Sequence, residues 1–177
     1  MRQSAKVALG GVIGALSLIC MLGTVFPYAI YAMPALAGIM LIPVVAEIGV
    51  RWAWLVFGSV AALSLMIILS YSPEATAMYV AFLGYYPVLR VTLQKLPFFI
   101  AWPLKLLVFN AAVISVYWAL MNLAAIPPDA FEMFGVDLPQ VMLVFGNVVF
   151  IIYDLALENI YLLYIKYLHP QIKRLFH

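Results

Sequence analysis

Charged residues are scarce in this 177-residue sequence, since Asp, Glu, Lys and Arg together make up only 9% of it. Hydrophobic residues make up 68%. This composition excludes an ordinary soluble domain, in which about a quarter of the residues are charged. Inside lipid, backbone hydrogen bonds must be satisfied within the segment, which favours helices. The sequence therefore predicts an all-α, polytopic membrane protein in contact with membrane lipid.

Residues that support common chemistries are also scarce. Cys20 is the single cysteine, which excludes an internal disulfide and a cysteine-based zinc cluster. The two histidines, His169 and His177, both lie near the C-terminal end. No HExxH, GxSxG, P-loop or GxGxxG pattern occurs. We expect a protein that is not an enzyme, with no metal and no cofactor, and the net charge of +2 gives no reason to expect nucleic-acid binding.

Six apolar segments are long enough to be considered as membrane crossings. A crossing needs about 20 residues, and the fourth segment, which contains Gly84 and Pro87, is the shortest. Together the six segments leave no room for a soluble domain, so residues 1–177 are predicted to form one integral membrane domain. The predicted crossings are residues 7–26, 32–46, 52–70, 75–89, 97–123 and 139–165.

The positive residues indicate the orientation. With the N-terminus in the cytoplasm, Lys and Arg fall on the cytoplasmic face or near it, including Arg51 between crossings two and three and Arg90 between crossings four and five. The opposite face carries Glu74 and Asp129 and no positive residue. This bias predicts both termini on the cytoplasmic side.

Charged residues inside the predicted crossings form a pattern. On the sixth crossing Asn147, Asp154 and Glu158 recur at helical spacing and share one face. Lys105 on the fifth crossing lies at a similar depth. We expect an ion pair between Lys105 and either Asp154 or Glu158, because isolated charges inside a membrane are unfavourable. Such a pair could join two helices, contact a partner protein, or relay a proton or ion.

Aromatic and amide side chains in the outer half could line a substrate pocket, since ligand sites are commonly aromatic with a few polar groups. Aromatic belts at the membrane surface and interhelical amide bonds are the alternative explanations. The candidates are Tyr28, Tyr31, Tyr79, Tyr117, Trp118, Asn122 and Asn147.

Small residues recur at a spacing of four on the first crossing, where Gly10 pairs with Gly14 and Gly11 with Ala15. This spacing permits close approach of a second helix. The second helix could belong to this chain or to a separate subunit.

The stretch from Pro34 to Gly58, PALAGIMLIPVVAEIGVRWAWLVFG, resembles the second and third helices of the substrate-binding (S) components of energy-coupling factor (ECF) vitamin transporters. The six-helix plan of the whole chain is also similar to that family. The resemblance implies that the first helix docks a transmembrane coupling subunit, which works with ATPase subunits. It also implies a small-molecule ligand in the outer half, near Tyr28, Tyr31, Asn122 and Asn147.

The sequence thus predicts the substrate-capturing subunit of a multi-component importer for a small molecule such as a vitamin, in a bacterial cytoplasmic membrane. The alternative is a scaffold that does not transport, because the rod-shape protein MreD has a similar six-helix plan. An importer predicts a closed cavity with polar and aromatic walls in the outer half. A scaffold predicts a bundle filled by its own side chains and an exposed apolar groove.

Overall fold

The computed structural model describes residues 3–123, 132–133 and 136–176, which are almost entirely helical. Asp129 of the predicted outer loop lies outside these residues. A pair of two-residue strands, β1 (Glu132–Met133) and β2 (Val136–Asp137), is antiparallel. The helices are α1 (Gln3–Leu22), α2 (Ala32–Ile39), α3 (Leu41–Glu47), α4 (Val50–Ile67), α5 (Pro73–Met78), α6 (Tyr86–Leu93), α7 (Phe98–Leu123), α8 (Leu138–Leu163) and α9 (His169–Phe176), with 3-10 turns η1 (Gly23–Val25) and η2 (Pro27–Ala29) and π-helical segments η3 (Tyr79–Leu83) and η5 (Tyr164–Leu168).

Four helical segments of the described chain are long and apolar enough to cross a membrane: Gln3–Val25, Val50–Ile67, Phe98–Ala119 and Leu143–Ile172. They overlap the predicted first, third, fifth and sixth crossings. The prediction of a helical protein with several helices long and apolar enough to span a membrane is confirmed. The predicted second crossing corresponds to the shorter apolar segment Ala32–Glu47, and the predicted fourth to the interrupted helix of residues 73–93.

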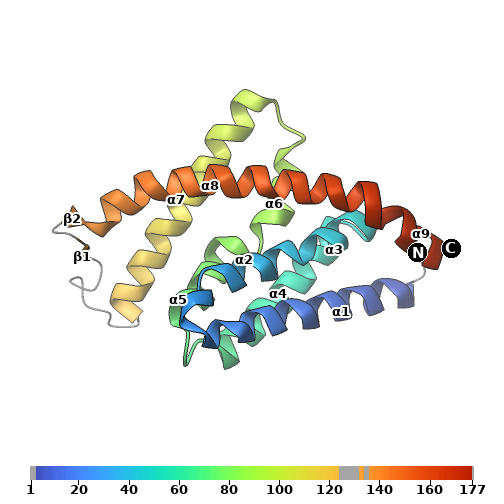
Figure 1. Ribbon diagram of the computed structural model, residues 1–177, viewed down its shortest axis with the longest axis horizontal. Coiled ribbons are helices and arrows are strands. Elements are labelled where there is room, and N and C mark those ends of the chain that lie inside the picture. Colours follow the sequence, from blue (N-terminus) through green and yellow to red (C-terminus); the bar gives the residue numbers. More distant parts are fainter. Residues whose placement is uncertain (1–2, 124–131, 134–135, 177) are drawn as a thin grey trace.

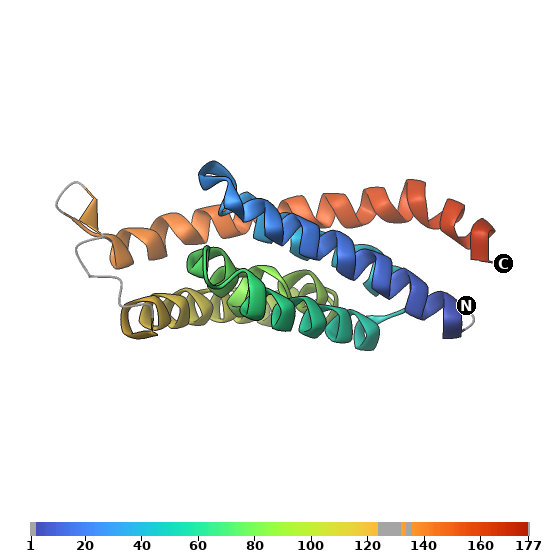
Figure 2. The same ribbon diagram turned by 90° about the horizontal axis from the view of Figure 1, so that it is seen from below.

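The helices form two layers (Figures 1 and 2). One layer contains α8, the pair α2–α3, and α1, with α8 and α1 at its opposite edges. The other contains α7, the segment α5–η3–α6, and α4. Contacts between the layers join α1 to α4, α2 to η3 and α8 to α7. The N- and C-termini lie at the same end of the molecule (Figure 1).

Prolines account for the interruptions in the two shorter segments. Pro43 lacks an N–H and cannot donate to the carbonyl of Ile39, the residue at which α2 ends. Pro87 has the same relation to Leu83, the last residue of η3. Each segment is therefore interrupted, and the carbonyl groups of Ile39 and Leu83 receive no helical hydrogen bond from the proline four residues later.

Gly38 brings these two interrupted segments together. A Cβ atom built at Gly38 would lie 2.0 Å from the carbonyl oxygen of Leu83. Such a distance is far below van der Waals contact, so only glycine lets the backbone of α2 approach η3 here. A second glycine, Gly49, has a φ of 96° and forms the turn from α3 to α4, a backbone conformation that other residues rarely adopt.

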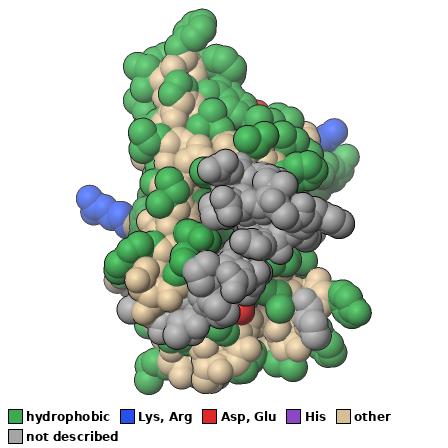
Figure 3. Space-filling model, turned by 90° about the vertical axis from the view of Figure 1, so that its left-hand side faces the viewer, with side chains coloured by type: hydrophobic (Ala, Val, Ile, Leu, Met, Phe, Trp, Pro, Cys, Tyr) green, Lys and Arg blue, Asp and Glu red, His purple; other side chains and the backbone are tan. Residues whose placement is uncertain are grey.

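Two groups of buried side chains fill the bundle. The first joins α1, α2, α3 and α4 around Met21, Leu41 and Val44, and the second joins α6, α7 and α8 around Tyr86, Phe150 and Leu157. Large hydrophobic side chains are also exposed along α1, α4, α7 and α8. Figure 3 shows mostly hydrophobic side chains on the end of the molecule that it presents. A surface of this kind is suited to lipid rather than water.

The Gly38 contact predicts a large difference between two glycine substitutions. Gly38→Ala should lower the free energy of unfolding by about 1–3 kcal/mol or more, because its methyl group would overlap the Leu83 carbonyl. Gly58→Ala is the control, since a Cβ at this exposed position on α4 meets nothing within 4 Å. Thermal unfolding in detergent, followed by circular dichroism, measures both. Equal stability of the two variants would contradict the close contact.

Candidate functional site

Asp154 on α8 is the centre of a buried polar network. Its Oδ1 accepts hydrogen bonds from the Tyr86 hydroxyl at 2.6 Å and from Arg90 Nε at 2.8 Å. Its Oδ2 accepts a hydrogen bond from Lys105 Nζ at 2.8 Å. Arg90 also donates from its second nitrogen, Nη2, to Glu158 Oε2 at 3.0 Å. One carboxylate thus joins α6, α7 and α8.

Helical spacing explains how these groups meet. Tyr86 and Arg90 are four residues apart on α6, and Asp154 and Glu158 are four apart on α8, so each pair shares a face. Tyr86 contacts Asp154, and Arg90 reaches both acids, so α6 and α8 run in the same direction at this contact.

A second polar contact shows the direction of α7 relative to α8. The amides of Asn110 and Asn147 donate to each other at 3.2 and 3.1 Å, and each also donates to a carbonyl of its own helix. Lys105 pairs with Asp154, further along α8, while Asn110 pairs with Asn147. Higher numbers on α7 therefore match lower numbers on α8, and the two helices are antiparallel.

The network is electrically balanced, with two cations and two carboxylates. The side chains of Arg90, Lys105 and Asp154 are 4%, 7% and 2% exposed, whereas that of Glu158 is 50% exposed. Lys105 also lies over the ring of Trp102, with Nζ 5.1 Å from the centroid. Removal of one partner from a buried pair leaves an uncompensated charge, which is strongly destabilising.

Aromatic rings cover one side of this network. Tyr86 stacks on Phe82 with a centroid distance of 4.6 Å, and Phe109 stacks on Phe150 at 4.8 Å. The ring of Tyr153 lies 6.0 Å from that of Tyr86, and its buried hydroxyl has no hydrogen-bond partner among the described residues. The rings shield the charges and thereby strengthen the interactions among them.

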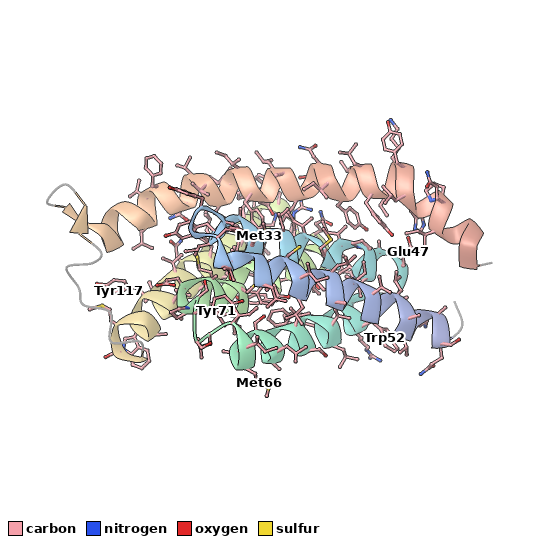
Figure 4. All side chains as sticks on the ribbon, turned by 60° about the horizontal axis from the view of Figure 1, so that its bottom comes forward. Met33, Glu47, Trp52, Met66, Tyr71 and Tyr117 are labelled. Atoms are coloured by element: carbon pink, nitrogen blue, oxygen red, sulfur yellow. The ribbon has the colours of Figure 1, made fainter. Side chains whose placement is uncertain are left out.

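A separate polar cluster lies near the C-terminal end, where Glu47 of α3 faces the end of the α8 helix (Figure 4). The Tyr164 hydroxyl donates to Glu47 Oε1 at 2.9 Å, and His169 Nδ1 lies 2.7 Å from the same oxygen. Residues five apart lie about 140° apart around an α-helix. The π-helical segment η5, whose hydrogen bonds link residues five apart, places Tyr164 and His169 on one face.

The predicted ion pair can now be placed. Lys105 contacts Asp154, and the described contacts of Glu158 are with Arg90 rather than with Lys105. The placement of Arg90 in a cytoplasmic loop was wrong, because Arg90 lies within α6 and is buried. Sequence reasoning therefore missed Arg90 and Tyr86. The four-residue spacing that they share with Asp154 and Glu158 was the signal that could have found them.

The predicted substrate residues differ widely in their surroundings. Tyr28, Tyr31 and Trp118 are exposed, and Tyr79 is fully buried. Asn122 donates to the carbonyl of Trp118 on its own helix. Asn147 pairs with Asn110, and Tyr117 lies towards the end of α7 that is distant from Glu47 (Figure 4). Their surroundings thus range from exposed to fully buried.

The small residues of α1 line an apolar groove between α1 and α4, with a volume of about 470 Å³. Trp52, Ser59 and Leu63 belong to its α4 wall, and the α1 wall consists of Val7, Gly10, Gly11, Gly14, Ala15 and Leu18.

Two of the α1 glycines serve packing within the chain. Cβ atoms built at Gly10 and Gly14 would lie 3.3 and 3.5 Å from methyl carbons of Val56, whereas one built at Gly11 meets nothing within 4 Å. Ala15 is also exposed. Gly10 and Gly14 thus let α1 approach α4, and Gly11 and Ala15 are left open to an external helix.

The chemistry of Asp154 favours a structural role. Both of its oxygens accept hydrogen bonds from charged or hydroxyl donors of α6 and α7, and its side chain is only 2% exposed. Among the described residues, no group of three or more His, Cys, Asp or Glu side chains is placed to hold a metal ion.

The balanced network predicts coupled effects of two substitutions. Lys105→Met and Asp154→Asn should each destabilise the protein, because each leaves the network with one uncompensated charge. The double variant keeps the Arg90–Glu158 pair and is neutral, so it should recover part of the loss, with a coupling energy of about 1–3 kcal/mol. Thermal unfolding in detergent of all four proteins measures this cycle.

Lys95→Met is the matched control for Lys105→Met, because Lys95 is exposed in the turn between α6 and α7. It should change stability by less than about 0.5 kcal/mol. If the loss of stability in the double variant equals the sum of the losses in the two single variants, Lys105 and Asp154 are not energetically coupled.

Comparisons with known proteins give no independent assignment. No family model matches the chain, and no curated protein or solved structure matches it. The assignment of a function therefore rests on the contacts and exposed surfaces described above.

Proposed function

We propose that the chain crosses the membrane six times, with both termini on the cytoplasmic side. The parallel course of α6 and α8, and the antiparallel course of α7, support this topology, since alternate crossings must run in the same direction. The position of both termini at one end of the molecule also supports it, because it requires an even number of crossings (Figure 1). The distribution of Lys and Arg supports a cytoplasmic position for that end.

For function, we propose a non-catalytic subunit of a larger membrane complex that docks a transmembrane helix of a partner protein. The observation that carries this proposal is the groove between α1 and α4. Gly11 and Ala15 leave space there for a second helix to approach closely, and in lipid such packing is a main source of helix association. In the ECF family, which the chain resembles, the first helix is the docking helix.

Two roles were predicted for such a subunit, a substrate-capturing importer subunit and an MreD-like scaffold that does not transport. The geometry supports the scaffold better. Interior polar groups such as Asp154 and Asn147 are satisfied by other side chains of the chain itself. The predicted substrate residues are dispersed between exposed and buried positions. A bundle filled in this way, beside an exposed groove, is what a scaffold requires.

The second candidate is the substrate-capturing subunit of an importer. Besides the resemblance, one observation favours it: the hydroxyls of Tyr79 and Tyr153 are buried without a hydrogen-bond partner among the described residues. Buried polar groups normally have a partner, and a bound small molecule could supply it. In this role the protein would bind a small molecule as well as a partner helix.

The topology predicts opposite labelling of the two ends of α4. In a Cys20→Ala background, Tyr71→Cys should react with a membrane-impermeant thiol reagent added to intact cells, and Arg51→Cys should react only after lysis. Both native side chains are exposed, which makes the pair matched. Labelling of Arg51→Cys in intact cells would reverse the proposed orientation.

The docking proposal predicts which glycine substitution removes the partner. Gly11→Leu should abolish recovery of partner subunits from native membranes, because its side chain fills the groove, while a Cβ at this position meets nothing within 4 Å. Gly58→Leu, at an exposed glycine outside the groove walls, should leave recovery unchanged. Native mass spectrometry of the purified complexes detects both the partner and any retained small molecule.

The outcomes of this experiment separate the two roles. A partner without a small molecule supports the scaffold, and a small molecule retained by the wild-type protein supports the importer. If the wild type and Gly11→Leu recover the same partners, the groove is not the docking site.

A further inference from the structure

A bend separates α8 from α9. Pro170, the second residue of α9, lacks an N–H and cannot donate to the carbonyl of Lys166. The π-helical segment η5 directly precedes α9, and prolines and π-helical turns are the common causes of sharp bends in helices. α9 accordingly turns away from the line of α8 (Figures 1 and 2).

Glu47 of α3 contacts both sides of this bend. Its Oε1 accepts a hydrogen bond from Tyr164, the first residue of η5, and lies 2.7 Å from Nδ1 of His169, the first residue of α9. A carboxylate only accepts hydrogen bonds, so Nδ1 carries the proton. Of the α9 side chains that the structure describes, those of residues 169–172, only His169 and Ile172 are partly buried. The contact with Glu47 is therefore a main attachment of α9.

The charge of Glu47 is compensated differently from that of Asp154. Asp154 is paired with Arg90 and Lys105, whereas the ion pair that the described residues offer Glu47 is with His169. The Glu47 side chain is only 5% exposed, so water cannot replace that partner while the contact is closed. A neutral histidine can still donate from Nδ1, but only a protonated histidine supplies a positive charge. The compensation of Glu47 therefore depends on pH.

Other cations near this end do not take over the role of His169. Lys166 and Arg51 are exposed, and within the described part of the chain neither forms an ion pair with Glu47. The charged and titratable groups on the elements around His169 are Glu47, Arg51, Tyr164, Lys166, Lys173 and Arg174, of which the last two have side chains outside the described part.

We propose that Glu47 and His169 form a pH-dependent latch that holds α9 against α3. While His169 is protonated, the ion pair keeps the latch closed. As the pH rises through the range in which histidines lose their proton, Glu47 loses this cation. A buried carboxylate without its partner is strongly unfavourable, so α9 moves away at the bend and Glu47 gains contact with water.

The latch does not depend on the docking of a partner helix. Under the proposed topology this end of the chain lies in the cytoplasm, so the latch responds to the pH of that compartment. The charge change is local, and the bend beside it is the element that moves.

The test measures the position of α9 in the full-length protein. In a Cys20→Ala background, spin labels are attached to Gly58→Cys on α4 and Gln171→Cys on α9, both at exposed positions. Double electron–electron resonance in phosphatidylcholine nanodiscs gives the distance between the labels at about pH 6 and about pH 8.5, on either side of the usual titration of histidine. A second distance should be populated about threefold more at the higher pH.

Three variants assign this change to the latch. His169→Gln removes the cation and should populate the second distance at both pH values. Glu47→Gln removes the buried charge and should give one distribution that does not change with pH. His177→Gln is the matched control, because it replaces the only other histidine of the sequence, and it should behave like the wild type.

Several results would overturn the proposal. Equal distance distributions of the wild type at the two pH values would do so, and this comparison needs no folded variant. A pH-dependent change that survives Glu47→Gln, or one that His177→Gln abolishes, would assign the effect to other groups. A His169→Gln protein that keeps the low-pH distance at both pH values would show that the ion pair does not hold α9.

Discussion

The carboxylate of Asp154 is the interaction on which the arrangement of the second half of the chain depends. In a membrane the hydrophobic effect does not drive one helix against another, so packing and polar contacts must define which helices are neighbours. Asp154 accepts donors from α6 and α7 and has no other way to compensate its charge. These contacts fix the register of three helices at once, and the reciprocal amide pair of Asn110 and Asn147 fixes it again further along α7.

In the first half of the chain, proline and glycine residues define which helices are neighbours, as Asp154 does in the second half. Pro43 and Pro87 interrupt two segments at a position four residues upstream, which leaves short helices rather than straight spans. Gly38 then lets one interrupted segment contact the carbonyl oxygen of the other. Gly10 and Gly14 do the same for α1 and α4 through Val56. Close backbone approach thus adds to the packing of large buried side chains such as Met21 and Leu41 in this half.

These two halves leave different surfaces exposed. On the α1 edge, the surface is an apolar groove in which the absence of a side chain at Gly11 leaves space. On the α8 edge it is an apolar stripe with one half-exposed carboxylate, that of Glu158. An interior whose charges are mutually compensated, between two such surfaces, is consistent with a subunit that holds other helices in place.

The sequence by itself determined which segments are apolar helices, because lipid requires about 20 consecutive apolar residues for each crossing. It also brought Lys105 to a depth similar to that of Asp154 and Glu158, since consecutive antiparallel helices can be aligned by counting residues. Arg90 could not be placed in this way, because it follows a short segment broken by Pro87 and is close to the exposed Lys95. Only the folded chain shows that α6 continues past Arg90 and lies against α8.

The contact of Glu47 with Tyr164 and His169 shows a further limit. Residues five apart do not share a face of an α-helix, and the π-helical turn that brings them together leaves no clear pattern in the sequence. The tertiary structure alone also decided that Gly10 and Gly14 face α4 while Gly11 is left open. Spacing along a helix defines which residues share a face, but which neighbour covers that face depends on the packing of the whole bundle.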